Sequence, residues 1–265
     1  MTPVFFRRDV LNKYYANPDL YSVEDGYIRC AGLWGLRLDN DLQEHVMVFL
    51  GDLGRDIPLS EAQYWRSFNI APQERVSETL IKRAFRGEFA DPQSVDLRFA
   101  RAYERTNRAW EAKYGWPLFK PLHTADEHVL AKLHIPLLDT QAEFDEQVGY
   151  LAKLLVDSLN VEAITPPMRN AAKSDGGLAR LQRFLAEQGL TDPATTLRPF
   201  ARIQGLRSRG AAHRKGSDYD LTVAIGELDR RQGFAKMLSE AVQTLELLRN
   251  HAEGQGADKA ERAEE

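Results

Sequence analysis

Short apolar runs separated by turn residues dominate the first 60 positions, a pattern typical of β-strands. The segments 26–40 and 45–54 both contain β-branched and aromatic residues, and the turn sequence 39–41 lies between them. Gly32 and Gly35 indicate a bulge or a close backbone contact. We therefore predict a β-hairpin in a small sheet. The second segment is continuously apolar at its centre, which predicts that both faces of this sheet are covered.

Helix-forming residues with charges throughout follow at 77–114. Ser77 suits a helix start, and Gly115 suits a helix stop because glycine tolerates the left-handed backbone that ends many helices. The inward face of this region is predicted to consist of Leu97, Ala100, Tyr103 and Trp110.

Beyond the prolines that follow residue 116, apolar positions recur at helical spacings of three and four. The segments 143–160, 177–189, 195–213 and 234–250 each present one apolar face, and Gly189 ends the second of them. Four helices with short connections predict a bundle. The expected buried residues include Phe144, Val148, Leu151, Leu155, Leu178, Leu181, Leu185, Leu197, Phe200, Ile203, Leu206, Phe234, Met237, Leu238, Ala241, Val242, Leu245 and Leu248.

These patterns together predict an α+β fold. A small mixed domain, built on the β-hairpin with accompanying helices, is expected at 1–125, and a helical bundle at 126–252. The polar residues 253–265 are expected to be disordered, because they contain too few apolar side chains to form a core.

Composition narrows the classes of protein that the chain can belong to. Of its 265 residues, 43% are hydrophobic and 28% are charged, as in ordinary globular proteins. No apolar run suits a membrane span or a signal peptide, so we expect a cytoplasmic protein without a membrane partner. The single cysteine, Cys30, excludes an internal disulfide and a cysteine-based zinc cluster. The formal net charge of −4 gives no argument for a nucleic-acid role, which has to come from local clustering.

One window of the sequence, 197–216, is locally basic and contains no acidic residue. A positive potential of this kind attracts polyanions. His213 lies within the window and titrates near neutral pH. On a regular helix Arg209 shares a face with His213, whereas Arg207 points about 120° away from it. The six basic residues of the window are Arg198, Arg202, Arg207, Arg209, Arg214 and Lys215.

A histidine among arginines, without a carboxylate partner or metal ligands at suitable spacing, suits cleavage of a phosphodiester by an internal nucleophile. In RNA the 2′-OH attacks the adjacent phosphorus. The histidine takes the proton of that hydroxyl or supplies one to the leaving oxygen, while guanidinium groups stabilise the charge on the phosphate. This chemistry needs no metal.

Arg207, five intervening residues and His213 resemble the R-x4-6-H motif of the HEPN superfamily of helical-bundle domains. Ser208 fills the position after the arginine, where a polar residue is common in that family. The resemblance covers residues 126–252. It implies a metal-independent ribonuclease with two motifs juxtaposed across a dimer, as in toxin–antitoxin, CRISPR and abortive-infection systems. One toxin branch carries a tyrosine two residues after the histidine, where this chain has Lys215.

We therefore expect an endoribonuclease that acts on RNA as a homodimer, without cofactors, in antiviral defence or a toxin–antitoxin-like system. His213 and Arg207 are the expected catalytic residues. The N-terminal domain would sense a trigger, choose the substrate or hold the enzyme inactive, and a regulatory protein partner is compatible with this role. The expected substrate-binding residues are Arg209, Ser208, Arg214, Lys215 and Arg202.

Two other interpretations remain open from the sequence. In the first, the bundle is the dimerisation surface of an assembly or nucleic-acid-binding subunit, and the basic window grips a backbone without cutting it. In the second, the window is a solvated basic helix end that interacts favourably with the helix dipole, in a purely structural partner of a larger complex.

Other motifs have simpler interpretations. The segment 51–56 (GDLGRD) lacks the lysine and the Ser/Thr of a P-loop, so we expect a tight turn after a strand. His123 and His128 bracket two acidic residues, but we expect no metal site there. Asp39 and Asp41 are interpreted as turn residues.

Overall fold

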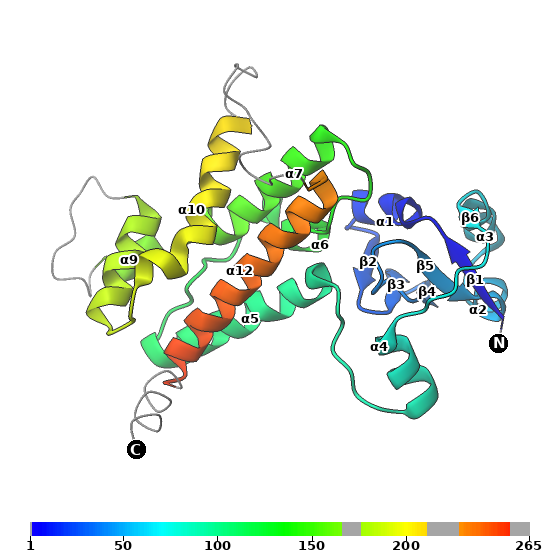
Figure 1. The fold of residues 1–265 in the computed structure, drawn as a ribbon, viewed down its shortest axis with the longest axis horizontal. Helices are drawn as coiled ribbons and strands as arrows, with labels where there is room; N and C mark the ends of the chain where they lie inside the picture. The colour runs from blue at the N-terminus through cyan, green and yellow to red at the C-terminus, as the bar shows by residue number, and fades with distance from the viewer. Residues whose placement is uncertain (1, 166–175, 211–227, 255–265) are drawn as a thin grey trace. The chain divides into compact units, whose positions relative to one another are not determined.

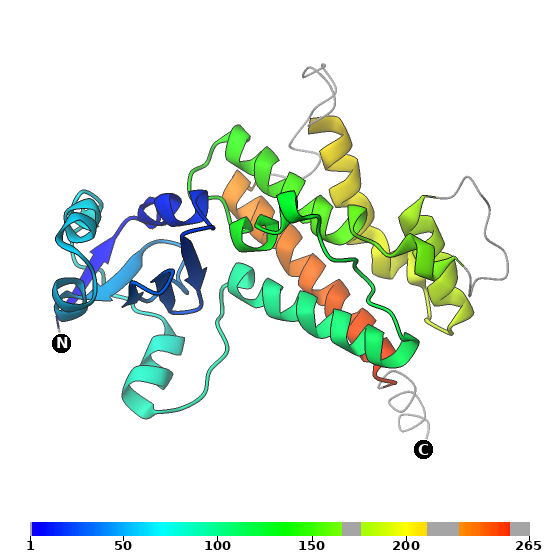
Figure 2. The same ribbon diagram turned by 180° about the vertical axis from the view of Figure 1, so that it is seen from behind.

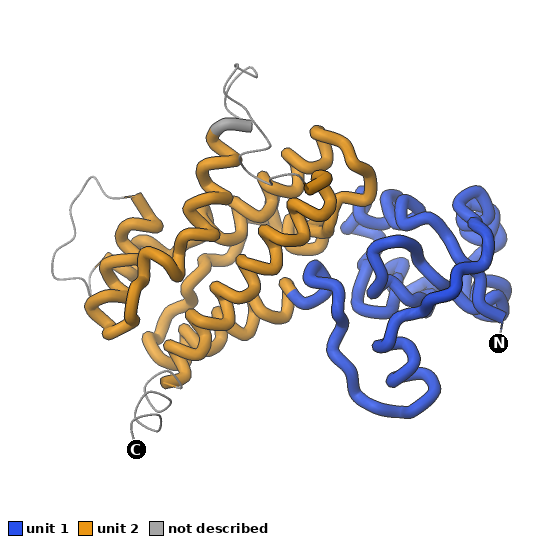
Figure 3. The backbone as a smooth tube through the Cα atoms, in the orientation of Figure 1, with its two compact units in different colours: residues 1–98 blue, residues 99–265 orange. Residues whose placement is uncertain are grey.

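The computed structural model describes residues 2–165, 176–210 and 228–254. The chain divides into two compact units, unit 1 at 1–98 and unit 2 at 99–265 (Figure 3). Strands β1 to β6 all lie in unit 1, and long helices make up unit 2. The predicted α+β fold class is therefore confirmed.

The division between the units lies in the first turn of helix α5 (Val95–Tyr114), whereas the sequence suggested a boundary after residue 125. Helix α5 belongs with the C-terminal helices because its buried face packs against them. The Thr106 hydroxyl donates to the carbonyl of Leu245 over 2.9 Å, and Trp110 is fully buried. An amphipathic pattern shows that a helix covers an apolar surface, but it does not identify which surface that is.

Two three-stranded antiparallel sheets form the centre of unit 1. Their strand orders are β5-β1-β6 and β2-β3-β4, so β4 and β5 are both edge strands (Figure 1). The strands are β1 (Pro3–Phe6), β2 (Tyr21–Glu24), β3 (Tyr27–Cys30), β4 (Trp34–Arg37), β5 (Val46–Phe49) and β6 (Asn69–Ile70).

The predicted pairing of the two strand segments is mostly wrong. The first segment folds back on itself as the β3–β4 hairpin, and β5 pairs with β1 in the other sheet. The two segments meet at the isolated antiparallel bridge between Asp39 and Met47, with N–H···O distances of 2.7 and 3.0 Å. The hairpin turn contains Ala31 at a φ of 44°. Gly32 lies in the same turn, but its place within one strand segment predicted a bulge or a close backbone contact and not a turn.

Gly35 makes a close contact, but with a side chain and not with the backbone that its position in a strand predicted. A Cβ atom at Gly35 would lie 2.5 Å from Cε1 of Tyr27, so the ring of Tyr27 can lie across β4 because residue 35 has no side chain. Gly32 differs, since a Cβ atom there would meet no described atom within 4 Å.

Short helices and buried aromatic side chains complete unit 1. Tyr14 and Trp65 are fully buried, and Trp65 Nε1 donates to the Tyr14 hydroxyl over 2.7 Å. Ser77 caps α4 by accepting a hydrogen bond from the N–H of Leu80, which confirms the predicted helix start. The helices are η1 (Arg8–Leu11), α1 (Asn12–Ala16), α2 (Leu50–Asp56), α3 (Leu59–Arg66), α4 (Glu78–Leu80) and the π-helical turn η2 (Ile81–Arg86).

Unit 2 is a helical bundle in which α10 contacts α7, α9 and α12 (Figures 1 and 2). Helix α5 runs along α12, to which it is linked by the Thr106 hydroxyl. In addition to α5, the elements are η3 (Thr124–Asp126), α6 (Val129–Lys132), α7 (Gln141–Ala152), its π-helical continuation η4 (Lys153–Asp157), α8 (Val161–Ile164), α9 (Gly177–Glu187), α10 (Pro193–Gly210) and α12 (Arg230–Ala252).

Helical periodicity predicted the buried faces of these long helices correctly. All the apolar residues expected on the inward faces of α7, α10 and α12 are buried, whereas in α9 Leu181 and Leu185 are buried and Leu178 is half-buried. In α5 the prediction was partly correct: Tyr103 and Trp110 are buried, whereas Leu97 and Ala100 are half-buried and Phe99 occupies the core instead. The bundle therefore supplies a rigid framework for the C-terminal end of α10, where the predicted site begins.

Candidate functional site

The predicted catalytic arginine lies at the C-terminal end of α10. Arg207 and Ser208 are in its last turn. Arg209 belongs to the same turn, where the structure describes its backbone. The remaining residues of the predicted site, His213, Arg214 and Lys215, lie outside the described residues.

Arg207 is accessible to solvent and already has an acidic partner. Its side chain is 36% exposed, and its Nη1 donates to Oδ2 of Asp157, the last residue of η4. A guanidinium carries N–H donors on three nitrogen atoms, so this contact leaves capacity for a second acceptor. Arg207 can therefore contact an anion, but the anion has to compete with Asp157.

Arg202 makes a similar ion pair with an acidic residue of a different element. Its Nη2 donates to Glu240 on α12, whereas Arg207 contacts η4. The two arginines therefore face different elements, and the described structure does not direct them at one point. Ser208 is exposed, and its hydroxyl donates to the carbonyl of Gln204 over 2.9 Å, which ties it to its own helix.

The positive charge of the basic window is thus partly neutralised by acidic side chains from other elements. Asp157 and Glu240 come from elements distant in sequence and pair with two of its arginines. The window contains no acidic residue of its own, so its sequence suggested a stronger positive potential than the fold provides.

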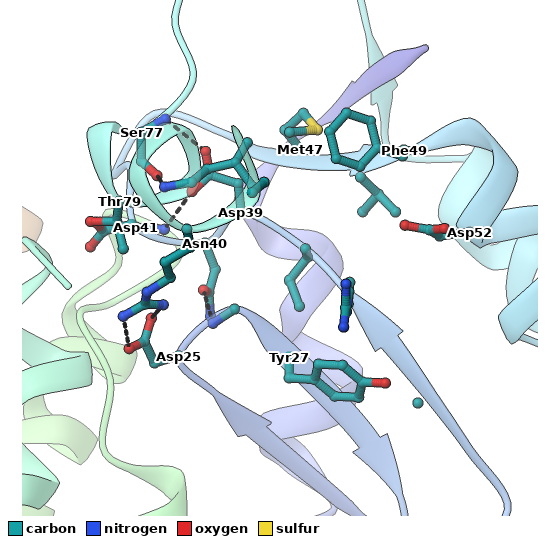
Figure 4. A pocket seen from close by; sticks show the side chains of 18 of the residues that line it. Asp25, Tyr27, Asp39, Asn40, Asp41, Met47, Phe49, Asp52, Ser77 and Thr79 are labelled. Carbon is teal, nitrogen blue, oxygen red and sulfur yellow. Dashed lines mark hydrogen bonds and ion pairs between the residues drawn. The ribbon is translucent and has the colours of Figure 1, made fainter. Parts of the chain in front are cut away.

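A cavity of about 940 Å³ in unit 1 was not predicted from the sequence (Figure 4). Strands β3, β4 and β5, the loop 39–41, helix α2 and the α4–η2 segment contribute to its walls. Its size is within the range of small-molecule sites. The cavity lies beside the edge strands β4 and β5, which belong to different sheets and are joined near the Asp39–Met47 bridge. Its lining residues are distant in sequence, so no local motif predicts the cavity.

Asp39, Asn40 and Asp41 form a buried polar cluster at this cavity and are more than turn residues. Asp39 Oδ2 accepts the N–H of Ser77 over 2.7 Å, and Asp41 Oδ1 accepts the N–H of Ser94 over 2.6 Å. Each of the three side chains is nearly inaccessible to solvent. The carboxylates of Asp39 and Asp41 thus hold the backbone at Ser77, the cap of α4, and at Ser94, just before α5. The sequence pattern indicated only a turn.

One further sequence interpretation is contradicted by the structure. Residues 51–56 are helical in α2, so the predicted tight turn is wrong. Asp126, beside His123 and His128, is held by Lys153 over 2.5 Å. Within residues 2–165, 176–210 and 228–254, no three His, Cys, Asp or Glu side chains are grouped as metal ligands.

Comparisons with known proteins find no relationship: no family model, no curated protein and no solved structure matches the chain. In the part of the chain that the structure describes, no helix has both the length and the apolar character for crossing a membrane.

Proposed function

We propose that unit 2 is a metal-independent endoribonuclease of the HEPN type that acts as a homodimer. The observation that carries the proposal is the position of Arg207: a solvent-accessible guanidinium in the last turn of a bundle helix, six residues before His213. The resemblance to the R-x4-6-H motif joins these two residues in one site.

The proposed reaction is an internal transesterification of RNA. The 2′-oxygen forms a bond to phosphorus as the bond from phosphorus to the 5′-oxygen breaks, which leaves a 2′,3′-cyclic phosphate and a 5′-hydroxyl. His213 accepts the 2′-OH proton or donates one to the 5′-oxygen, and Arg207 stabilises the additional charge on the phosphoryl oxygens. Arg209, Ser208, Arg214, Lys215 and Arg202 are the proposed contacts to the rest of the RNA.

Cleavage of single-stranded RNA in EDTA tests this proposal. We expect the purified full-length chain to cut, and His213→Ala to lower the rate by about 10²- to 10⁴-fold, the usual contribution of a general acid or base. Arg207→Ala should also lose activity. Arg108→Ala is the matched control, because Arg108 is exposed on α5, outside the basic window, where it pairs with Glu104.

Activity that is absent from the wild-type protein, or undiminished in His213→Ala, would reject the nuclease. Circular dichroism checks that each variant retains its helices, and light scattering after size exclusion tests the dimer.

A second candidate function is a nucleic-acid-binding or assembly subunit without catalysis. The ion pairs of Arg202 with Glu240 and of Arg207 with Asp157 favour it, because both arginines already stabilise contacts between elements of the bundle. RNA binding that survives His213→Ala, with no cleavage by either protein, would support this function instead.

A further inference from the structure

The unit 1 cavity carries an excess of negative charge. Five aspartates and three arginines are among the residues that line it, which leaves two carboxylate charges uncompensated. Asp39 and Asp41 are only 5% and 6% exposed, and hydrogen bonds from backbone N–H groups hold both carboxylates in place. Figure 4 shows these residues on one side of the cavity and Asp52, carried by α2, on the other.

Two of the three arginines are committed to aspartates. Arg83 makes a bidentate pair with Asp25, with distances of 2.8 and 2.7 Å. Arg55 donates to both oxygens of Asp56, over 2.7 and 2.9 Å, and to Asp52 over 2.7 Å. A phosphate or carboxylate ligand would have to displace these carboxylates to reach Arg55 or Arg83. The third lining arginine, Arg37, lies near Asp56 and helps to lower the pKa of its carboxyl, so an anion at Arg37 would also meet a carboxylate.

The remaining wall is apolar and aromatic. Met47 is buried and Phe49 is half-buried on β5, and the ring of Tyr27 lies across β4 beside Gly35. The guanidinium of Arg29, which is not a lining residue, stacks on the Tyr27 ring at 4.4 Å from its centre. Phe49 therefore offers the surface on which an apolar ligand body would pack.

We propose that this cavity binds a small organic cation. Its ammonium or guanidinium group pairs with Asp52, which shares the single guanidinium of Arg55 with Asp56, and its apolar or aromatic body lies against Phe49. A cation balances the surplus carboxylate charge, whereas a neutral ligand leaves it unmatched. The cavity volume suits a small molecule, and the proposal is independent of the nuclease in unit 2.

Three probes with one shared phenylethyl body separate charge from shape. Phenethylamine is cationic, 2-phenylethanol is neutral and 3-phenylpropionate is anionic. Each is titrated into the full-length ¹⁵N-labelled chain, and the amide signals of Gly26 and Gly35, which line the cavity, are compared with those of Gly115 and Gly189 in unit 2. We expect phenethylamine to shift the first pair selectively, and to bind at least about five-fold more tightly than 3-phenylpropionate.

Substitutions that remove a carboxylate charge test where the cationic group of the ligand binds. Asp52→Asn should weaken phenethylamine binding about three-fold or more, and Asp56→Asn provides a second variant if the first does not fold. Asp19→Asn is the matched control, because Asp19 is exposed in the same unit and does not line the cavity. Equal or tighter binding of the anion, no shift at Gly26 and Gly35, or equal effects of Asp52→Asn and Asp19→Asn would each overturn the proposal.

Discussion

Hydrogen bonds of buried polar side chains link separate segments of unit 1, and Tyr14 is the clearest example. Its hydroxyl donates to Glu61 over 2.8 Å and accepts from Trp65 Nε1 over 2.7 Å, and all three side chains are buried. The ammonium of Lys13 binds the other oxygen of Glu61 and lies 4.9 Å from the ring centre of Tyr64. Burial and the hydrogen bond to Glu61 raise the pKa of Tyr14 far above its ordinary value, so its hydroxyl remains a donor.

Replacing Tyr14 with phenylalanine removes one hydrogen bond from Glu61 and one from Trp65. Glu61 and Trp65 then each keep a buried polar atom with one partner fewer, and we expect unit 1 to lose about 1–3 kcal/mol of unfolding free energy. Urea unfolding followed by tryptophan fluorescence measures the loss. Tyr150→Phe is the control, because the Tyr150 hydroxyl makes a 2.7 Å bond to Glu146 that is exposed. A similar effect of the two substitutions would show that burial of the network is not what matters.

At the scale of elements, helix ends are stabilised by side chains that the sequence only partly reveals. Thr140 caps α7, and Glu143 in its first turn accepts the N–H groups of Leu137 and Leu138 over 2.7 and 2.9 Å. Burial tends to raise the pKa of Glu143. The imidazole of His134, whose Nε2 lies 3.4 Å from Oε1, and the hydrogen bonds from the two N–H groups outweigh it and hold this pKa below its ordinary range. The ionised carboxylate therefore anchors the loop that precedes α7.

This depressed pKa makes the contribution of Glu143 pH-dependent. A carboxyl whose pKa is lower in the folded state stabilises the protein above its unfolded pKa, about 4.3 for glutamate, and loses that contribution as pH falls through the folded pKa. We expect Glu143→Gln to cost about 1–2 kcal/mol at pH 7 and the cost to shrink below pH 4. Urea unfolding at both pH values measures it. Glu104→Gln, in an exposed pair with Arg108, should show no such trend, and a cost for Glu143→Gln that stays constant with pH would contradict the assignment.

Sequence patterns predicted elements better than they predicted pairings between elements. The helix cap at Ser77, the left-handed Gly189 at 85° and the apolar face of α10 all follow from residues close together in the chain. The partners of β5 and α5 depend on which distant surface each covers, and a single sequence does not encode that in a local pattern. For the same reason the Asp157 partner of Arg207 and the unit 1 cavity were missed.

At the scale of the whole molecule, the question is how a chain with a formal charge of −4 would hold RNA. The basic window supplies the only local surplus that the sequence suggested, and the fold pairs Arg202 and Arg207 with Glu240 and Asp157. If RNA binds along α10, each of these acidic side chains competes with a phosphate. The strength of RNA binding is then set by local acid–base pairing as well as by the number of arginines.

Removing the two acidic competitors should therefore strengthen RNA binding. We expect Asp157→Asn/Glu240→Gln to bind a 2′-O-methylated single-stranded RNA, which lacks the internal nucleophile, at least about three-fold more tightly at low salt. Each arginine that gains a phosphate contact should also steepen the slope of log K against log salt by about 0.7. Fluorescence anisotropy over a range of salt concentrations measures both quantities.

The control for that experiment changes the net charge equally but elsewhere. Glu104→Gln/Glu162→Gln removes two exposed carboxylates that pair with Arg108 and Lys120, outside the basic window. If net charge alone governs binding, the two double variants will behave alike, and a role for α10 in gripping RNA is lost. If the window is the binding surface, the change in slope will be larger for Asp157→Asn/Glu240→Gln, because only this pair frees two guanidinium groups of the window, those of Arg202 and Arg207.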